Sequence, residues 1–279
     1  MCIVGSVGRD ASNGRDDVVT VQLLLNLNAE WAALPAPLAT DGRAGRRTIA
    51  AIESFQRQAV KMRLPDGRVE PNRSTLAHLR GGLPPGFSAA KLHGVMIRAT
   101  PVGLATYAAP LATRMAVHGI DTPLRMAHFL AQIAHESGDL RYAEELGSGA
   151  RYEGRADLGN RRYGDGRRFK GRGLIQLTGR ANYARYGKAR GRDFTTAAGA
   201  RALATDPELA VDVACWFWHD RGLNAFADAD DLAAVTRVIN GGAVGLAQRR
   251  AKLDRARFFF GAVPLTARTP CSTKQSAFA

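Results

Sequence analysis

The sequence lacks the features of a disulfide-stapled or membrane-spanning protein. Its three cysteines, Cys2, Cys215 and Cys271, are isolated and odd in number, so they predict no disulfide framework and no cysteine-rich metal site. No apolar run reaches the roughly 20 residues that a transmembrane helix needs. The first eight residues have no basic segment, and their apolar run is too short for a signal peptide. We expect a chain that is made and folded in a reducing cytoplasm.

Acidic residues are also scarce, because the chain has 25 Asp and Glu against 39 Lys and Arg, a net charge of +14. An excess of this size predicts an anionic partner, such as nucleic acid, an acidic membrane surface or an acidic cell-wall polymer. The arginines are scattered through the chain, without the aromatic-interleaved basic stripe or zinc-finger spacing of nucleic-acid-binding domains. We therefore expect no nucleic-acid partner.

Helical periodicity is abundant, in two regions that a Gly- and Pro-rich segment separates. Length and pattern together predict a mainly α fold with two domains. The predicted boundaries are 1–82 for a small three-helix domain, 83–92 for a linker, 93–265 for a larger helical domain and 266–279 for a tail. The predicted helices cover residues 18–27, 49–60 and 74–79 in the small domain, and 92–97, 103–118, 122–137, 207–220, 231–239 and 246–260 beyond it.

The small region carries two similar phrases, residues 40–48 and 65–76. In each, an Asp-Gly pair predicts a tight turn, and a Thr or Ser then begins a helix. Together the phrases resemble the repeat of the small three-helix peptidoglycan-binding domains, which implies anchoring to the cell wall. The residues that carry this resemblance are Asp41, Gly42, Gly45, Thr48, Ala51, Ile52, Phe55 and Gln56 in the first phrase, and Asp66, Gly67, Val69, Pro71, Thr75, Leu76 and Leu79 in the second.

The larger region places one carboxylate at the end of a well-punctuated helix. Thr122 suits the N-cap, Pro123 suits the first turn and Gly138 stops the helix. Glu136 then falls at the C-terminus, at the edge of an apolar stripe. The negative end of the helix dipole and the apolar neighbours both favour its protonated form, which a general acid needs. The alternative is an exposed glutamate in a fraying last turn.

Two more carboxylates, Glu144 and Glu145, follow within nine residues. Hydrolysis of a glycosidic bond uses such a pair, since one protonated carboxyl gives its proton to the leaving oxygen while an ionised one activates water or attacks the sugar. Residues 174–178 alternate in polarity as a short extended piece, which would send Gln176 and Thr178 to one side. An amide and a hydroxyl presented together suit sugar hydroxyls, N-acetyl groups or a held water. The alternatives are a solvated Glu-Glu pair and a half-buried edge strand.

With these residues the chain resembles glycoside hydrolase family 19, whose chitinase-type, lysozyme-like α-helical fold phage endolysins also use. The matching pieces occur in family order across roughly residues 93–262, at positions 134–138, 171–178, 182–183, 238–242 and 245–249. The resemblance implies that Glu136 corresponds to the general acid and Glu145 to the base, with Glu144 as the substitute if the loop differs by one residue. Thr178 matches the residue that helps to hold the nucleophilic water. The substrate-binding positions correspond to Gln176, Asn182, Tyr183, Asn240 and Arg249.

Members of this family invert the anomeric carbon, so the resemblance implies carboxyl groups about 6.5–9.5 Å apart with a water between base and sugar. It implies no metal and no other cofactor. The pair His135-Glu136 also lacks the second histidine of a His-Glu-x-x-His zinc site. We expect His128 and His135 to be solvated or supporting residues, and the aromatics at 216–218 to belong to the core.

The sequence therefore predicts a peptidoglycan-degrading endolysin, a muramidase-type glycosidase that hydrolyses β-1,4 bonds of the wall glycan and lyses bacteria. We expect a monomer that stays in the host cytoplasm until its release, acts on the cell wall or periplasm, and also binds an anionic outer-membrane surface. The wall-binding repeat favours peptidoglycan over chitin. The competing hypotheses are a chitinase with the same catalytic residues, a non-catalytic wall-binding protein, and a metal-dependent amidase or peptidase.

Overall fold

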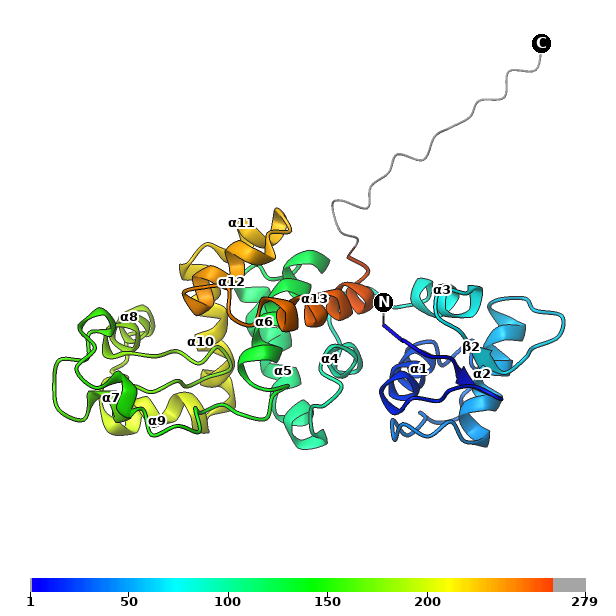
Figure 1. The fold of residues 1–279 in the computed structure, drawn as a ribbon, viewed down its shortest axis with the longest axis horizontal. Helices are drawn as coiled ribbons and strands as arrows, with labels where there is room; N and C mark the ends of the chain where they lie inside the picture. The colour runs from blue at the N-terminus through cyan, green and yellow to red at the C-terminus, as the bar shows by residue number, and fades with distance from the viewer. Residues whose placement is uncertain (1, 263–279) are drawn as a thin grey trace, which may run out of the picture.

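The computed structural model describes residues 2–262 and is mainly helical, which confirms the predicted fold class (Figure 1). The N-terminal part packs three helices around one short antiparallel strand pair, in which Val7 lies opposite Val69. All three predicted helices of this part are present, whereas the strand pair was not predicted. The elements are β1 (Val7–Gly8), α1 (Arg15–Leu27), α2 (Arg46–Gln58), β2 (Arg68–Val69) and α3 (Ser74–Gly81).

A buried glutamine closes each Asp-Gly loop of this part in the same way. Its amide nitrogen donates to the aspartate carboxylate, and its amide oxygen accepts from the glycine N–H. The four bonds join Gln22 to Asp41 (2.9 Å) and Gly42 (3.1 Å), and Gln56 to Asp66 (2.6 Å) and Gly67 (3.0 Å). The two phrases are therefore a structural repeat, in which a buried polar group has its hydrogen-bonding capacity used.

The remaining helices build a larger body around α6 (Pro123–Glu136) and α13 (Leu246–Phe260), which pack along each other (Figure 1). The side chains of residues 126–134 are all buried, so α6 is buried around its circumference, with the polar His128 and Gln132 included, rather than along the single apolar stripe predicted from the sequence. The other predicted helices are α4 (Ala89–Val95), α5 (Pro101–Val117), α10 (Pro207–Asp220) and α12 (Leu232–Asn240). Unpredicted are α7 (Asp165–Arg168), α8 (Arg180–Arg190), α9 (Ala197–Thr205), α11 (Leu223–Asp228) and the 3-10 turns η1 (Ala150–Tyr152) and η2 (Ala156–Leu158).

A buried seam joins the two parts. Arg255 of α13 donates to Thr20 Oγ1 at 2.8 Å and to Cys2 O at 3.3 Å, and burial lowers the pKa of its guanidinium. On the same seam Gly94 lies against the ring of Phe259. A Cβ added at Gly94 would lie 2.5 Å from that ring, so α4 can pack this closely only through glycine.

The predicted linker is itself structured, because α4 begins inside residues 83–92 and Lys91 Nζ donates to Gly86 O at 3.1 Å. The boundaries proposed at residues 82, 92 and 265 stay predictions. Cys215 and the aromatics at 216–218 are buried, as predicted for core residues. The predicted tail, with Cys271, lies outside the described residues. Within residues 2–262 no helix is both long enough and apolar enough to cross a bilayer.

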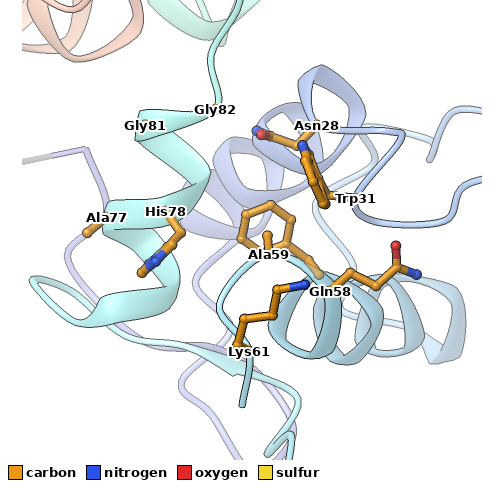
Figure 2. Close-up of a pocket in the computed structure, with 10 residues that line it drawn as sticks. Asn28, Trp31, Gln58, Ala59, Lys61, Ala77, His78, Gly81 and Gly82 are labelled. Atoms are coloured by element: carbon orange, nitrogen blue, oxygen red, sulfur yellow. The ribbon is translucent and has the colours of Figure 1, made fainter.

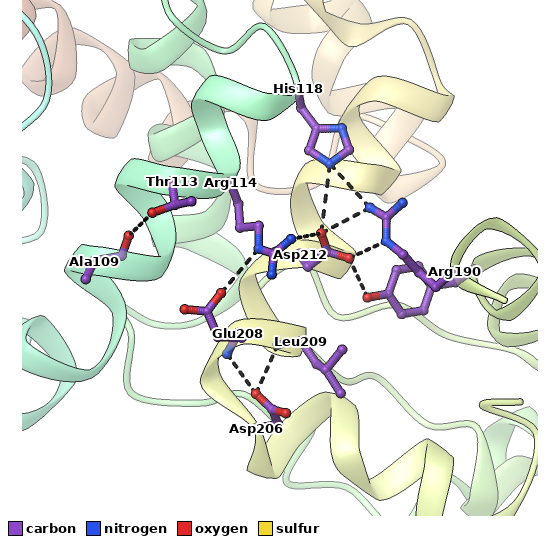
Figure 3. A network of polar contacts seen from close by, with 10 residues as sticks. Ala109, Thr113, Arg114, His118, Arg190, Asp206, Glu208, Leu209 and Asp212 are labelled. Atoms are coloured by element: carbon purple, nitrogen blue, oxygen red, sulfur yellow. Dashed lines mark hydrogen bonds and ion pairs between the residues drawn. The ribbon is translucent and has the colours of Figure 1, made fainter. Parts of the chain in front are cut away.

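A polar network ties α10 to α5 and α8 (Figure 3). Asp212 accepts from Tyr186 OH and Arg190 Nε, each at 2.6 Å, and Arg114 Nη1 lies 3.4 Å from its second oxygen. Burial alone would raise the pKa of Asp212. Hydrogen bonds with His118, Arg190 and Tyr186 outweigh burial and lower that pKa below its usual range. The carboxylate is thus charged and fully partnered inside the body.

Candidate active site

Glu136, the predicted general acid, is the last residue of α6. Thr122 caps the start of this helix as predicted, because its Oγ1 accepts from Arg125 N at 3.2 Å. The Glu136 side chain is 18% exposed, and its Oε1 accepts from Arg249 Nη2 at 2.5 Å. Its Oε2 accepts no hydrogen bond from any described residue. That oxygen is therefore the one available to carry a proton toward a substrate.

Arg249 reaches Glu136 from α13 through the interior, with a side chain only 2% exposed. The same guanidinium donates to Gln132 Oε1, one helical turn before Glu136. Charge-assisted bonds of this kind fix geometry as well as adding energy. Close to the same arginine, a Cβ added at Gly245 would lie 2.8 Å from His135 Nε2 and 3.7 Å from Arg249 Nε, so the loop after α12 packs closely on the end of α6. Burial, helped by Arg249, lowers the pKa of His135.

Glu145, the predicted base, lies on the irregular segment that follows α6. Its backbone N–H donates to Gly171 O at 2.9 Å, and Gly171 N donates back to Glu145 Oε2 at 3.1 Å. Its Oε1 accepts from Arg151 Nη2 at 2.7 Å and from Tyr152 OH at 3.3 Å. A Cβ added at Gly171 would lie 2.8 Å from Gln176 Oε1 and 3.4 Å from Glu145 Oε2. The side chains of Glu145 and Gln176 therefore both lie close to Gly171.

Glu144 points away from this group. It is 41% exposed, and its Oε1 accepts from Arg172 Nε at 2.9 Å and lies 3.5 Å from Lys170 Nζ. Successive side chains of an extended segment point to opposite faces. Glu144 and Glu145 therefore face opposite sides of their segment. Glu145 lies on the side of Gln176, whereas Glu144 forms ion pairs with Arg172 and Lys170.

Residues 174–178 do not form the extended piece predicted from their alternating polarity. Gly173 (φ 73°) and Gln176 (φ 56°) adopt left-handed backbone conformations, and Gln176 N donates to Gly173 O at 3.1 Å. The result is a tight turn whose ends meet where Leu177 N donates to Arg172 O at 2.8 Å. Ile175 and Leu177 are buried while Gln176 and Thr178 are half-buried, which is the alternation that suggested a strand.

The other predicted residues mostly hold backbone in place. Thr178 Oγ1 donates to Gln176 O at 3.0 Å, and Asn182 Nδ2 donates to Thr178 O at 2.8 Å. Tyr183 is fully buried and donates its hydroxyl to Lys170 O at 2.7 Å, so it supports the loop from behind rather than meeting a sugar. The remaining one, Asn240, ends α12 and donates to Val244 O at 3.1 Å.

The predicted residues thus fall into two groups. One contains Glu136 and Arg249, which are hydrogen-bonded at the centre of the body, and the other contains Glu145 and Gln176, which both lie near Gly171 on the loop. No hydrogen bond within residues 2–262 connects the two carboxylates. An inverting mechanism needs a sugar and a water between them, so a direct contact would have excluded it. The predicted separation of about 6.5–9.5 Å stays a prediction.

Sequence reasoning missed two partners of Glu145, Arg151 and Tyr152, and one partner of Arg249, Gln132. The sequence does carry a signal for Gln132, a polar residue in an otherwise apolar stretch one turn before the glutamate. Of the two environments predicted for His128, the solvated one is wrong, since its side chain is fully buried and pairs with Asp230 Oδ1 at 2.8 Å. His, Cys, Asp and Glu side chains of the described chain form no group of three or more that could hold a metal ion.

The amino-acid sequence is similar to that of one known protein family. The profile of the family described as chitinase class I matches residues 121–242. A glycosyl hydrolase family 19 domain-containing protein of Haemophilus influenzae is 33% identical over 169 residues, which cover 50% of this chain and 80% of that protein. An endochitinase of Arabidopsis thaliana is 36% identical over 118 residues, but these span only 39% of its length.

The fold has solved relatives as well. The crystal structure of chitinase C from Streptomyces griseus superposes with a TM-score of 0.53 at 22% identity, covering 63% of this chain and 94% of that one. The chain belongs to glycoside hydrolase family 19 and is a glycoside hydrolase. Its substrate is accordingly a glycan.

Proposed function

We propose that the protein hydrolyses β-1,4 bonds of peptidoglycan and acts as a bacteriolytic endolysin. The observation that carries the proposal is the combination of two parts in one chain. One is the family 19 body, and the other is an N-terminal part with two Asp-Gly loops, each of which is hydrogen-bonded to a buried glutamine. These loops resemble the repeat of peptidoglycan-binding domains. The net charge of +14 supports attraction to anionic wall and outer-membrane surfaces. We also propose that the protein acts as a monomer, after its release from a host cytoplasm.

An open groove in the N-terminal part supports wall binding (Figure 2). Its volume is about 430 Å³, and Trp31, Gln58, Lys61 and His78 are among the residues that line it. Trp31 is 46% exposed, so part of its indole is open to a ligand. An aromatic face beside amide and cationic donors suits a sugar ring or a short peptide.

The proposed mechanism gives each carboxylate one task. Glu136 donates a proton from its free oxygen to the bridging oxygen, which leaves with the departing sugar. Glu145 takes a proton from a water that attacks the opposite face of the anomeric carbon, with Thr178 helping to hold that water. The product end therefore has inverted configuration, and the two protons balance over the cycle through exchange with solvent.

The test is digestion of purified peptidoglycan and of chitin oligomers by the full chain, followed by mass spectrometry of the products. The proposal expects soluble muropeptides with new reducing ends, and fragmentation of these products after borohydride reduction identifies which of the two glycan linkages is cut. Activity on chitin alone would establish the chitinase alternative instead. Release of amino groups without reducing ends, blocked by chelator, would indicate an amidase or peptidase, and wall binding without cleavage would contradict a catalytic role.

A further inference from the structure

A second pocket lies on the far side of the segment that carries the proposed base. Its volume is about 530 Å³, and it is the place toward which Glu144 points. The residues that line it are Glu144, Gly164, Arg167, Arg168, Lys170, Arg172, Ala197 and Arg201. Five of these side chains are cationic and one is anionic, so the pocket has a strong positive potential.

The charges of this pocket are only partly compensated from within. Glu144 is already engaged by Arg172 and Lys170. The side chains of Arg167, Arg168 and Arg201 are exposed and form no ion pair within the described part of the chain. Like charges held together destabilise a folded protein unless an anion offsets them. The arrangement therefore fits a ligand that brings its own carboxylate or phosphate.

Lys170 connects the pocket to the proposed active site. Its Nζ donates to Glu145 O at 2.9 Å and lies 3.5 Å from Glu144 Oε1, so one side chain touches both carboxylate-bearing residues. A four-residue peptide that starts at a sugar in the active site spans roughly 13 Å when extended.

We infer that this basic pocket binds the free carboxylates of the stem peptides on peptidoglycan, and thereby selects peptide-bearing glycan over chitin. The inference rests on the proposed function. Chitin has no carboxylate, whereas each intact stem peptide presents several. Guanidinium groups bind carboxylates in a bidentate manner, which gives orientation as well as attraction.

The test compares two substrates, intact peptidoglycan and the same glycan after an amidase has removed its stem peptides. Arg167→Gln/Arg201→Gln removes two exposed charges of the pocket and touches neither proposed catalytic carboxylate. We expect kcat/KM on intact peptidoglycan to fall about tenfold while kcat/KM on the stripped glycan is unchanged. The control Arg57→Gln/Arg250→Gln removes two exposed arginines elsewhere and should leave both rates as in the wild type. Matching thermal unfolding curves would show that both variants fold.

Each other outcome is informative. Equal rates for wild type and pocket variant on both substrates, or an equal loss on both, would overturn the inference and leave the proposed function standing. A third substrate is peptidoglycan from which the phosphate-bearing wall polymers have been removed. If the pocket variant loses kcat/KM only on walls that still carry these polymers, the pocket binds their phosphate groups, and the stem-peptide assignment is overturned. A wild type that cleaves chitin but no form of peptidoglycan would overturn the proposed function and the inference with it.

Discussion

The two proposed catalytic carboxylates are held in opposite ways. Glu136 sits at the end of a buried helix and is gripped by one interior arginine, Arg249, whose side chain is 2% exposed. Glu145 sits on a loop and is held by the exposed Arg151, by Tyr152 and by the backbone of Gly171. The core of the larger body thus positions Glu136, the proposed acid. A loop positions Glu145, the proposed base, and the larger body in turn supports that loop. The difference predicts that substitutions affect the two sides unequally.

The largest effect is expected from Glu136→Gln. The amide keeps the shape of the side chain and its contact with Arg249 but cannot donate the proton, so kcat should fall by roughly 10³-fold or more. Reducing-end release from peptidoglycan measures the loss, and unchanged thermal unfolding shows that the helix is intact. Activity within a few-fold of wild type would remove Glu136 from the mechanism.

Glu145→Gln should come next, with a loss of roughly 10²- to 10³-fold in kcat, because the amide cannot take a proton from water. The matched control is its neighbour, since Glu144→Gln changes the same group on the opposite face of the segment. We expect Glu144→Gln to keep kcat on peptide-free glycan within a few-fold. The reverse ranking in the same assay would make Glu144 the base.

Asp212→Asn tests whether the network around Asp212 supports α8 and the loop that carries Glu145. Removing this buried charge leaves Arg190 without its counter-ion and Arg114 with Glu208 alone, which costs about 3–5 kcal/mol in the free energy of unfolding. In hydrogen exchange, α8 and the Glu145 loop should lose more protection than α6. Equal loss in both regions would mean that the loop side has no separate support.

The same variant makes a pH prediction. The pKa of Asp212 is lowered in the folded state, so the unfolded chain takes up a proton first as the pH falls. Its stabilising contribution is therefore complete above the unfolded pKa of 3.8 and is lost as the pH drops below it. Urea unfolding at several pH values should show the wild type losing its advantage over Asp212→Asn in acid. A constant difference down to pH 2 would contradict this.

The smallest effect is expected from Tyr152→Phe, which deletes the long hydrogen bond of 3.3 Å from the phenol to Glu145 and the bond that the same oxygen accepts from Arg151. Four other hydrogen bonds of Glu145 remain, two with Gly171, one with Arg151 and one with Lys170, so kcat should fall only two- to fivefold. Steady-state kinetics on peptidoglycan measure it. A hundredfold loss would show that Tyr152 does more than position the base.

Sequence reasoning succeeded where local signals agree with the fold. The helix that carries Glu136 has a Thr cap, a Pro in its first turn and a Gly stop, and each works as predicted. It failed where tertiary contacts decide. Helix α8 has no apolar stripe, and it forms because Tyr183 and Tyr186 bury themselves against the body. The turn at residues 173–176 looked like a strand because burial alternates there while the backbone does not extend.

The candidate site shows the same division. The identities of Glu136, Glu145 and Arg249 were available from family motifs, and the structure places Arg249 on Glu136. The contacts of Glu145 with Arg151 and Tyr152 were not predictable, because nothing distinguishes one arginine of that Arg-rich segment from the next until the loop closes. Spacing can suggest which residues act, whereas only the closed loop shows which residues hold them.

The most direct test of the two-carboxylate account is proton NMR of the first product formed from a β-1,4-linked glycan oligomer. Direct attack by a water that Glu145 activates predicts that the new reducing end appears first as the α-anomer and then mutarotates. Initial appearance of the β-anomer would mean that the bond is broken with retention, through an attack on the sugar by the enzyme or by the substrate itself, and would contradict the account.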